Sequence, residues 1–120
     1  MRLAPALALA VCLVLSACAA PPGKRAAQAA CDAYGNTAVK GDAPRAAAQK
    51  DADLAAASDP TWAALQRDIR AFYAQADANT AAHDAGRTVT AQQLDAYFAA
   101  DKRVRADCAS VGRDLGPLKP

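Results

Sequence analysis

The sequence predicts an all-α fold: a small antiparallel bundle of about four helices, closed by one disulfide. Apolar residues recur at the spacing of an amphipathic helix in several stretches, and Gly, Pro and N-capping residues separate these stretches. No run of alternating β-branched or aromatic residues is long enough to predict a strand. Two cysteines, Cys31 and Cys108, are placed to join the first and the last of the predicted helices.

The first two predicted helices are rich in alanine. One covers residues 24–40, although Gly35 inside it costs about 1 kcal/mol against alanine. Its apolar face contains residues at i, i+4, i+7 and i+11, namely Ala27, Cys31, Tyr34 and Ala38. The other covers residues 42–57 with Asp42 as its N-cap. Its many alanines favour close approach to a neighbouring helix.

The third and fourth predicted helices have clearer start signals. Asp59 caps the third helix, which covers residues 60–83 and begins with a proline. Thr90 and Gln93 form a capping box at the start of the fourth helix, and Gly112 ends it. Each helix carries an apolar stripe: Trp62, Leu65, Ile69, Phe72, Tyr73 and Ala76 on the third, and Leu94, Tyr97, Phe98, Val104, Cys108 and Val111 on the fourth.

The N-terminus has the features of an export signal. Arg2 supplies a positive charge, and residues 3–15 form an uncharged stretch rich in Ala, Leu and Val. This stretch is shorter than the roughly 20 apolar residues that a membrane-spanning helix needs. It ends in Leu15-Ser16-Ala17-Cys18, which resembles the lipobox of bacterial lipoproteins.

The resemblance to bacterial lipoproteins covers only residues 1–18. It implies that residues 1–17 are removed and that Cys18 carries a diacylglycerol on its thiol, with a further acyl chain such as palmitate on the new N-terminus. The mature protein is then anchored at the extracytoplasmic face of the cell membrane. Ala19 after the anchor resembles the outer-membrane sorting pattern of hosts with two membranes. Residues 18–23 are predicted to form a short proline-rich tether.

The remaining cysteines support the bundle topology. Cys12 leaves with the predicted signal and Cys18 is taken by lipid, so Cys31 and Cys108 are left as a pair. In an exported protein such a pair is most often a disulfide, and closing so long a loop contributes about 4–5 kcal/mol at most. The alternative, a redox or metal-binding pair, lacks a Cys-x-x-Cys motif. An up-down-up-down bundle brings the two cysteines to the same end.

The bundle is predicted to cover residues 24–112, followed by a tail over residues 113–120. The formal net charge is +2, so no excess of positive charge favours nucleic acid as a partner. Several basic residues nevertheless fall at the predicted membrane-facing base, where anionic lipid headgroups attract them. As an alternative, cations near a helix C-terminus complement the helix dipole, and the two interpretations are compatible. The residues are Lys24, Arg25, Arg105 and Arg113, with Lys102, Arg103 and Lys119 beside them.

Aromatic side chains could line a small apolar site between the third and fourth helices. Aromatic stripes at helical spacing are more often core than ligand box. Ligand binding therefore stays an alternative to a filled core at the five residues concerned, Trp62, Phe72, Tyr73, Tyr97 and Phe98.

Few residues are suited to acid–base chemistry, because the chain has one histidine and every acidic residue is aspartate. His83 lies near Asn79 and Asp84, but three converging metal ligands are not visible in the sequence. Asp101 falls on the apolar face of the fourth helix. It is either a buried carboxylate with a raised pKa or, as we favour, the partner of Arg105 at i+4. No enzyme activity, metal or cofactor is expected.

The sequence thus predicts a lipid-anchored extracytoplasmic protein with a non-catalytic role, as an interaction or envelope-associated binding module. Its expected partners are the membrane, through Cys18, and an envelope protein. The alternative is a carrier that holds a small apolar ligand between the third and fourth helices.

Overall fold

The structure, a computed structural model, describes residues 20–40 and 42–117, without the side chains of 37–40. It consists of four α-helices and one 3-10 turn: α2 (Pro22–Lys40), α3 (Asp42–Ser58), η1 (Pro60–Trp62), α4 (Ala63–Asp84) and α5 (Ala91–Ser110). No strand occurs in these described ranges, so the predicted all-α class is confirmed.

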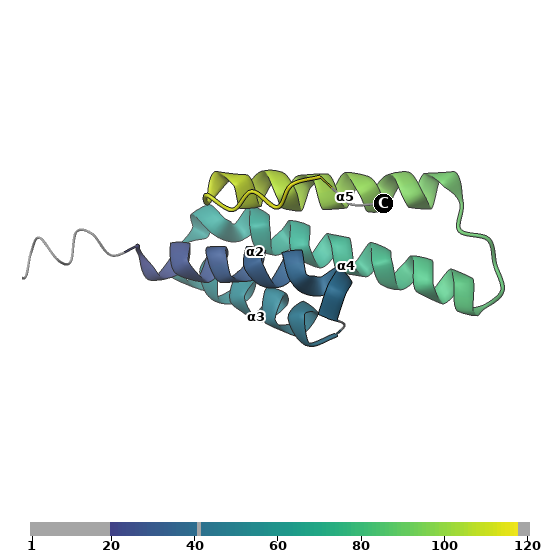
Figure 1. Ribbon diagram of the computed structural model, residues 1–120, viewed down its shortest axis with the longest axis horizontal. Helices are drawn as coiled ribbons and strands as arrows, with labels where there is room; N and C mark the ends of the chain where they lie inside the picture. Colours follow the sequence, from purple (N-terminus) through teal and green to yellow (C-terminus); the bar gives the residue numbers. More distant parts are fainter. Residues whose placement is uncertain (1–19, 41, 118–120) are drawn as a thin grey trace, which may run out of the picture.

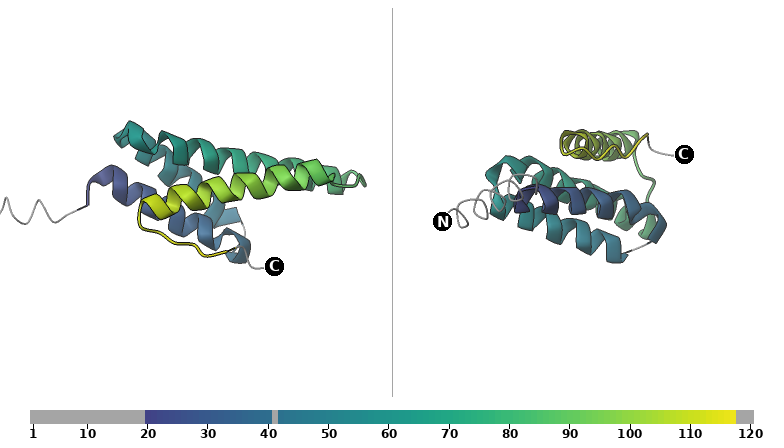
Figure 2. Two further views of the ribbon diagram at one scale, coloured as in Figure 1. Left: turned by 90° about the horizontal axis from the view of Figure 1, so that it is seen from above. Right: turned by 60° about the vertical axis from the view of Figure 1, so that its left-hand side comes forward.

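The helices run up, down, up and down, as two antiparallel hairpins laid side by side (Figure 1). Helix α2 packs mainly on α3, and α4 packs mainly on α5. Contacts between α3 and α4 join the two hairpins, whereas α2 and α5 touch each other much less. Helices α4 and α5 extend past the other pair at the end away from Pro22 (Figures 1 and 2). The molecule therefore has a four-helix base and a two-helix tip.

The N-terminal part of α2 begins earlier than predicted, at Pro22. Proline is well tolerated in the first turn of a helix, so it does not block this start. Gly23 also lies against the connection between α3 and α4. A Cβ on Gly23 would be 3.2 Å from the Cβ of Asp59 and 3.4 Å from Cδ1 of Trp62. The first turn of α2 is thus part of the packed base, where the sequence predicted a tether.

Both predicted N-caps of the last two helices are present, but only one of them directly precedes an α-helix. Asp59 accepts a hydrogen bond from the backbone N–H of Thr61, as an N-cap does, but the turn that it caps is 3-10 and the α-helix begins only at Ala63. The predicted capping box of α5 is present in full. Thr90 Oγ1 accepts from the N–H of Gln93, and the Gln93 side chain accepts from the N–H of Thr90.

The core combines small residues from α2 and α3 with larger ones from α4 and α5. The alanines let α2 and α3 approach closely, and Leu54, the one leucine of α3, is 55% exposed. The buried alanines of these helices are Ala26, Ala27, Ala30, Ala48, Ala52 and Ala55. The largest fully buried side chains are Leu65, Ile69, Tyr73, Val104 and Val111, together with the two cysteines.

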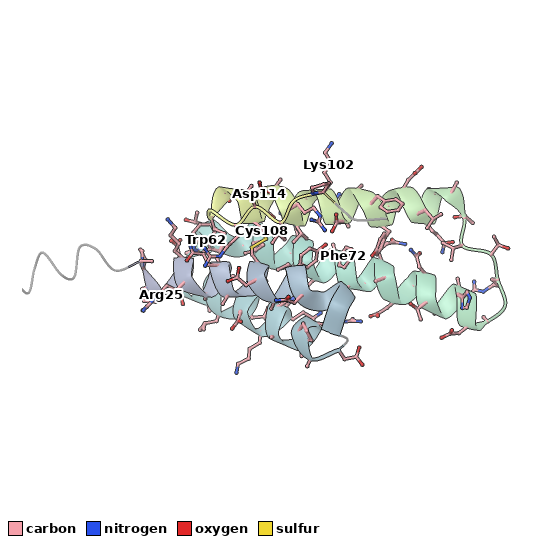
Figure 3. All side chains as sticks on the ribbon, viewed as in Figure 1. Arg25, Trp62, Phe72, Lys102, Cys108 and Asp114 are labelled. Atoms are coloured by element: carbon pink, nitrogen blue, oxygen red, sulfur yellow. A yellow bond between two sulfur atoms is a disulfide. The ribbon has the colours of Figure 1, made fainter. Side chains whose placement is uncertain are left out.

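A disulfide joins α2 to the last turn of α5. The Cα atoms of Cys31 and Cys108 are 5.6 Å apart and both side chains are fully buried (Figure 3). The predicted bridge is therefore confirmed. It connects two helices that have few other backbone contacts with each other, so it closes the base of the bundle covalently.

After α5 the chain turns back on itself. Gly112 adopts a φ of +81°, a left-handed conformation that favours glycine and reverses the direction of the chain. The segment that follows runs back along α5 (Figure 1), and Leu115 packs against the core. Residues 113–117 are thus part of the folded structure, although the sequence placed them in a tail outside the bundle.

Candidate functional site

Four of the five predicted ligand-lining aromatic residues form a continuous row between α4 and α5. Neighbouring ring centroids are 5.3 Å apart for Phe72 and Tyr73, 4.9 Å for Phe72 and Tyr97, and 5.5 Å for Tyr97 and Phe98. Tyr34 of α2 adds a fifth ring, edge-on to Phe72 at 5.0 Å. These rings touch one another, so they fill the space between the helices themselves.

The aromatic row leads from the core to the surface. Tyr73 and Phe72 are buried, Tyr97 is half-buried, and Phe98 is 52% exposed. Leu94, one turn before Phe98 on α5, is 42% exposed. Both exposed side chains belong to the part of α5 that forms or adjoins the two-helix tip (Figure 1).

Trp62, the remaining aromatic candidate, does not join the row. It lies nearer than Phe72 to the end of the bundle at which α2 begins, and its indole ring is close to Gly23 (Figure 3). Its Nε1–H is buried without a hydrogen-bond acceptor among the described residues. The structure thus separates Trp62 from the other four rings with which the sequence grouped it.

A buried polar network connects α2 to α5. The Tyr34 hydroxyl donates to Asp101 Oδ1 at 2.5 Å, and Arg105 Nε donates to Asp101 Oδ2 at 2.6 Å. The favoured i+4 pair is therefore present, but Asp101 is only 3% exposed, and Tyr34 is a partner that sequence reasoning missed. Burial and the hydrogen bond to Asp101 hold the pKa of Tyr34 far above its usual value. The network stabilises the fold and leaves no free acid or base.

The predicted membrane-facing basic residues divide into two groups. Lys24 and Arg25 are exposed in the first turn of α2 (Figure 3). Arg105, by contrast, is bound by Asp101 and by two backbone carbonyl groups of residues 115 and 116. Arg113 pairs with Asp32 of α2 at 2.9 Å. Only the first group has side chains directed to solvent without a protein partner that the structure identifies.

Two carboxyl groups meet between α4 and α5, which the sequence did not predict. Asp68 is 5% exposed, and its Oδ1 lies 3.1 Å from Arg67 Nε and 3.7 Å from Arg103 Nε. Burial, a side-chain hydrogen bond to Asp68 and repulsion from Asp68 raise the pKa of Asp107 to about 6. Asp107 Oδ2 is buried and no donor reaches it. These interactions favour the protonated form of the Asp107 carboxyl group.

His83 lies on the surface near the end of α4. Its side chain is 85% exposed, and its Nδ1 is 3.6 Å from Asp84 Oδ1. Within residues 20–40 and 42–117, no three His, Cys or acidic side chains gather closely enough to hold a metal ion.

Cys18, the predicted lipidation site, lies outside the described residues. In the part of the chain that is described, no helix combines the length and the apolar character needed to cross a bilayer. Comparisons of the whole chain with protein-family models, with curated proteins and with solved structures give no match.

Proposed function

We propose that the protein is a lipid-anchored, non-catalytic interaction module at the extracytoplasmic face of a bacterial membrane. The observation that carries this proposal is an adjacent pair of exposed apolar side chains on α5. Leu94 and Phe98 are exposed in the first half of α5, the half that forms or adjoins the two-helix tip, away from the end at which α2 begins (Figures 1 and 2).

The anchor and this pair on α5 would then lie towards opposite ends of the molecule. Cys18 precedes the start of α2 by only a few residues, so the base of the bundle would lie next to the bilayer. Lys24 and Arg25, exposed in that first turn, support the orientation, because each basic residue near an anionic leaflet contributes about 1 kcal/mol of binding. The tip formed by α4 and α5 would project into the envelope.

A protein partner fits the tip better than a small apolar ligand does. The four rings of the aromatic row contact one another from Tyr73 to Phe98, so a ligand would have to part them. Leu94 and Phe98, in contrast, are neighbours at i and i+4 on one helix face and are already in solvent. Single exposed apolar residues are ordinary, but an adjacent pair on a projecting hairpin favours a docking role.

The anchor is tested by native mass spectrometry, without reductant, on protein extracted gently from the host membrane. The proposal expects a mass that begins at Cys18, with acyl chains added and two hydrogens missing for the disulfide. An unlipidated chain that begins at Met1 would overturn the anchor. A retained small molecule would favour the carrier role in place of the interaction role.

The tip is tested by site-specific photocrosslinking in the host. A photoreactive residue at Phe98 should give a discrete protein adduct, and the same residue at Ala29, exposed on α2, serves as the matched control. Leu94→Gln should abolish the Phe98 adduct without lowering the melting temperature, because Leu94 is exposed. Equal labelling from both positions would contradict docking at the tip.

A further inference from the structure

We propose that the seam between α2 and α5 is a recognition site for a short non-helical segment of a protein partner, and that residues 113–117 occupy this site in cis. These residues are called the strap below. The inference goes beyond the docking proposed for Leu94 and Phe98, because the seam is a second surface and its contacts give the chemistry of the segment that is recognised.

The strap is held by three kinds of contact, each specific for a different chemical group. Asp32 of α2 binds the guanidinium of Arg113 at 2.9 Å. Arg105 Nη1 donates to the backbone carbonyls of Leu115 at 3.2 Å and of Gly116 at 2.6 Å. The Leu115 side chain packs against the core. A basic residue, two successive backbone carbonyls and a large aliphatic side chain two positions after the basic residue are therefore all recognised.

Gly35 makes room for the leucine. A Cβ at this position would lie 3.1 Å from Cδ2 of Leu115, closer than side chains normally approach. A glycine inside a helix destabilises that helix, so its presence in the middle of α2 is otherwise unfavourable. The space that it leaves on α2 is the space that the aliphatic side chain of the strap uses.

Arg105 is oriented independently of the strap. Asp101 Oδ2 binds Arg105 Nε at 2.6 Å, and the Tyr34 hydroxyl holds the other oxygen of the same carboxylate. The guanidinium would therefore keep its position when the strap leaves, with Nη1 free to donate to another backbone. A donor that is fixed in advance by buried partners binds a peptide carbonyl without first losing side-chain freedom.

The strap itself is suited to displacement. It has no regular secondary structure, and Asp114, Gly116 and Pro117 are exposed. The ion pair that holds Arg113 is open to water, since its two side chains are 39% and 53% exposed. In the strap, Asp114 Oδ1 also accepts from the Gly116 N–H at 2.9 Å and so holds the turn. A partner segment with the pattern basic–Asp–Leu–Gly would make the same contacts, and the high local concentration of the strap would compete with it.

The test uses the complete chain in detergent and a fluorescein-labelled peptide of sequence Gly-Arg-Asp-Leu-Gly-Pro. In the variant Arg113→Ala/Leu115→Asp the strap should leave the seam. Fluorescence anisotropy should then show binding at least about ten-fold tighter than to the wild-type chain, because the competing segment is gone. A peptide with Asp in place of its Leu is the matched control and should bind neither chain.

Charge reversal makes the assignment specific. Adding Asp32→Lys to the released variant should abolish binding of the Arg peptide, and a peptide with Glu in place of Arg should bind again. The proposal is overturned if the released variant, with its disulfide intact and its helical circular dichroism unchanged, binds the Leu peptide no better than the control. It is also overturned if the wild-type chain is a dimer that the released variant loses, since the seam would then take the strap of a second copy.

A second measurement covers the case in which the released variant does not fold. In wild-type protein labelled with ¹⁵N-glycine, excess unlabelled peptide should move the Gly116 amide resonance to the position that it has in the free peptide. An unmoved resonance at saturating peptide contradicts the proposal. Neither assay depends on Cys18, so loss of the anchor in the host would overturn the proposed membrane role and leave this site standing.

Discussion

The hydroxyl of Tyr34 and the carboxylate of Asp101, which are 67 positions apart in the chain, form a buried hydrogen bond between α2 and α5. Together with the disulfide, this contact joins two helices that otherwise touch each other little. It also fixes Asp101 so that its second oxygen can orient Arg105. The relationship makes Tyr34, which carries only one polar atom in its side chain, central to the stability of the base.

Tyr34→Phe should lower the free energy of unfolding by about 2 kcal/mol. The substitution keeps the ring contacts but removes a donor from a buried, charged acceptor, and hydrogen bonds of this kind contribute about 1.5–3 kcal/mol. Urea unfolding followed by circular dichroism would measure the change. Asp95→Asn, an exposed substitution on α5, is the control and should leave the midpoint unchanged. A Tyr34→Phe midpoint equal to that of the control would contradict the network.

Asp107 should make stability depend on pH. Its pKa is about 6 in the folded chain against an ordinary value of 3.8, so between these values the folded chain holds a proton that the unfolded chain has released. The stability that the protonated Asp107 contributes should therefore be fully present at about pH 4 and below. It should be lost as the pH rises through about 6. Thermal melts at closely spaced pH values would show a decline that ends once Asp107 has ionised.

Asp107→Asn removes this dependence, because an amide can still donate to Asp68 but does not ionise. We expect the variant to exceed wild type by about 1 kcal/mol at pH 7.5, a modest gain because Asp107 is partly exposed and solvent screens the repulsion. At about pH 4 the two proteins should be equally stable. A constant difference across the whole range would show that the pKa of Asp107 is not raised in the folded chain.

Loss of the disulfide should destabilise the bundle strongly. The bridge spans 77 positions. Closing a loop of that length lowers the entropy of the unfolded chain, which raises the free energy of unfolding by about 4–5 kcal/mol at most. Cys31→Ala/Cys108→Ala should therefore melt at a much lower temperature than wild type. Wild-type protein melted in reductant should behave like the double variant. Coincident melting curves with and without reductant would mean that the bridge contributes little.

Gly35→Ala should change stability by different amounts in two backgrounds. In a Leu115→Ala chain it should raise stability by about 1 kcal/mol, because alanine is the better helix former. In the wild-type chain the gain should be smaller or absent, since the new methyl group would lie 3.1 Å from Leu115 Cδ2. Urea unfolding of the four proteins in a double-mutant cycle would give the coupling, which we expect to be about 0.5–1 kcal/mol. Additive effects would mean that Leu115 does not use the space above Gly35.

Local signals in the sequence predicted those features that depend on neighbouring residues. Three predictions of this kind were confirmed: the helices from their periodicity, the capping box of Thr90 and Gln93, and the disulfide from the pair of cysteines. The boundary at Pro22 was predicted less well. Gly23 packs against Asp59 and Trp62 there, and nothing in the local sequence indicates that contact.

By itself, then, the sequence determined the number of helices, their antiparallel order and the bridge that closes them, because spacing, capping and cysteine pairing act over short stretches or through composition. Only the tertiary structure decided that Asp68 meets Asp107 and that Tyr34 reaches Asp101. Those contacts depend on how each helix is rotated about its axis, which small differences in packing settle. The position of the strap also depends on the tertiary structure. Its position on α2 and α5 arises from a gap at Gly35 and a fixed Arg105, and both exist only once the helices are assembled.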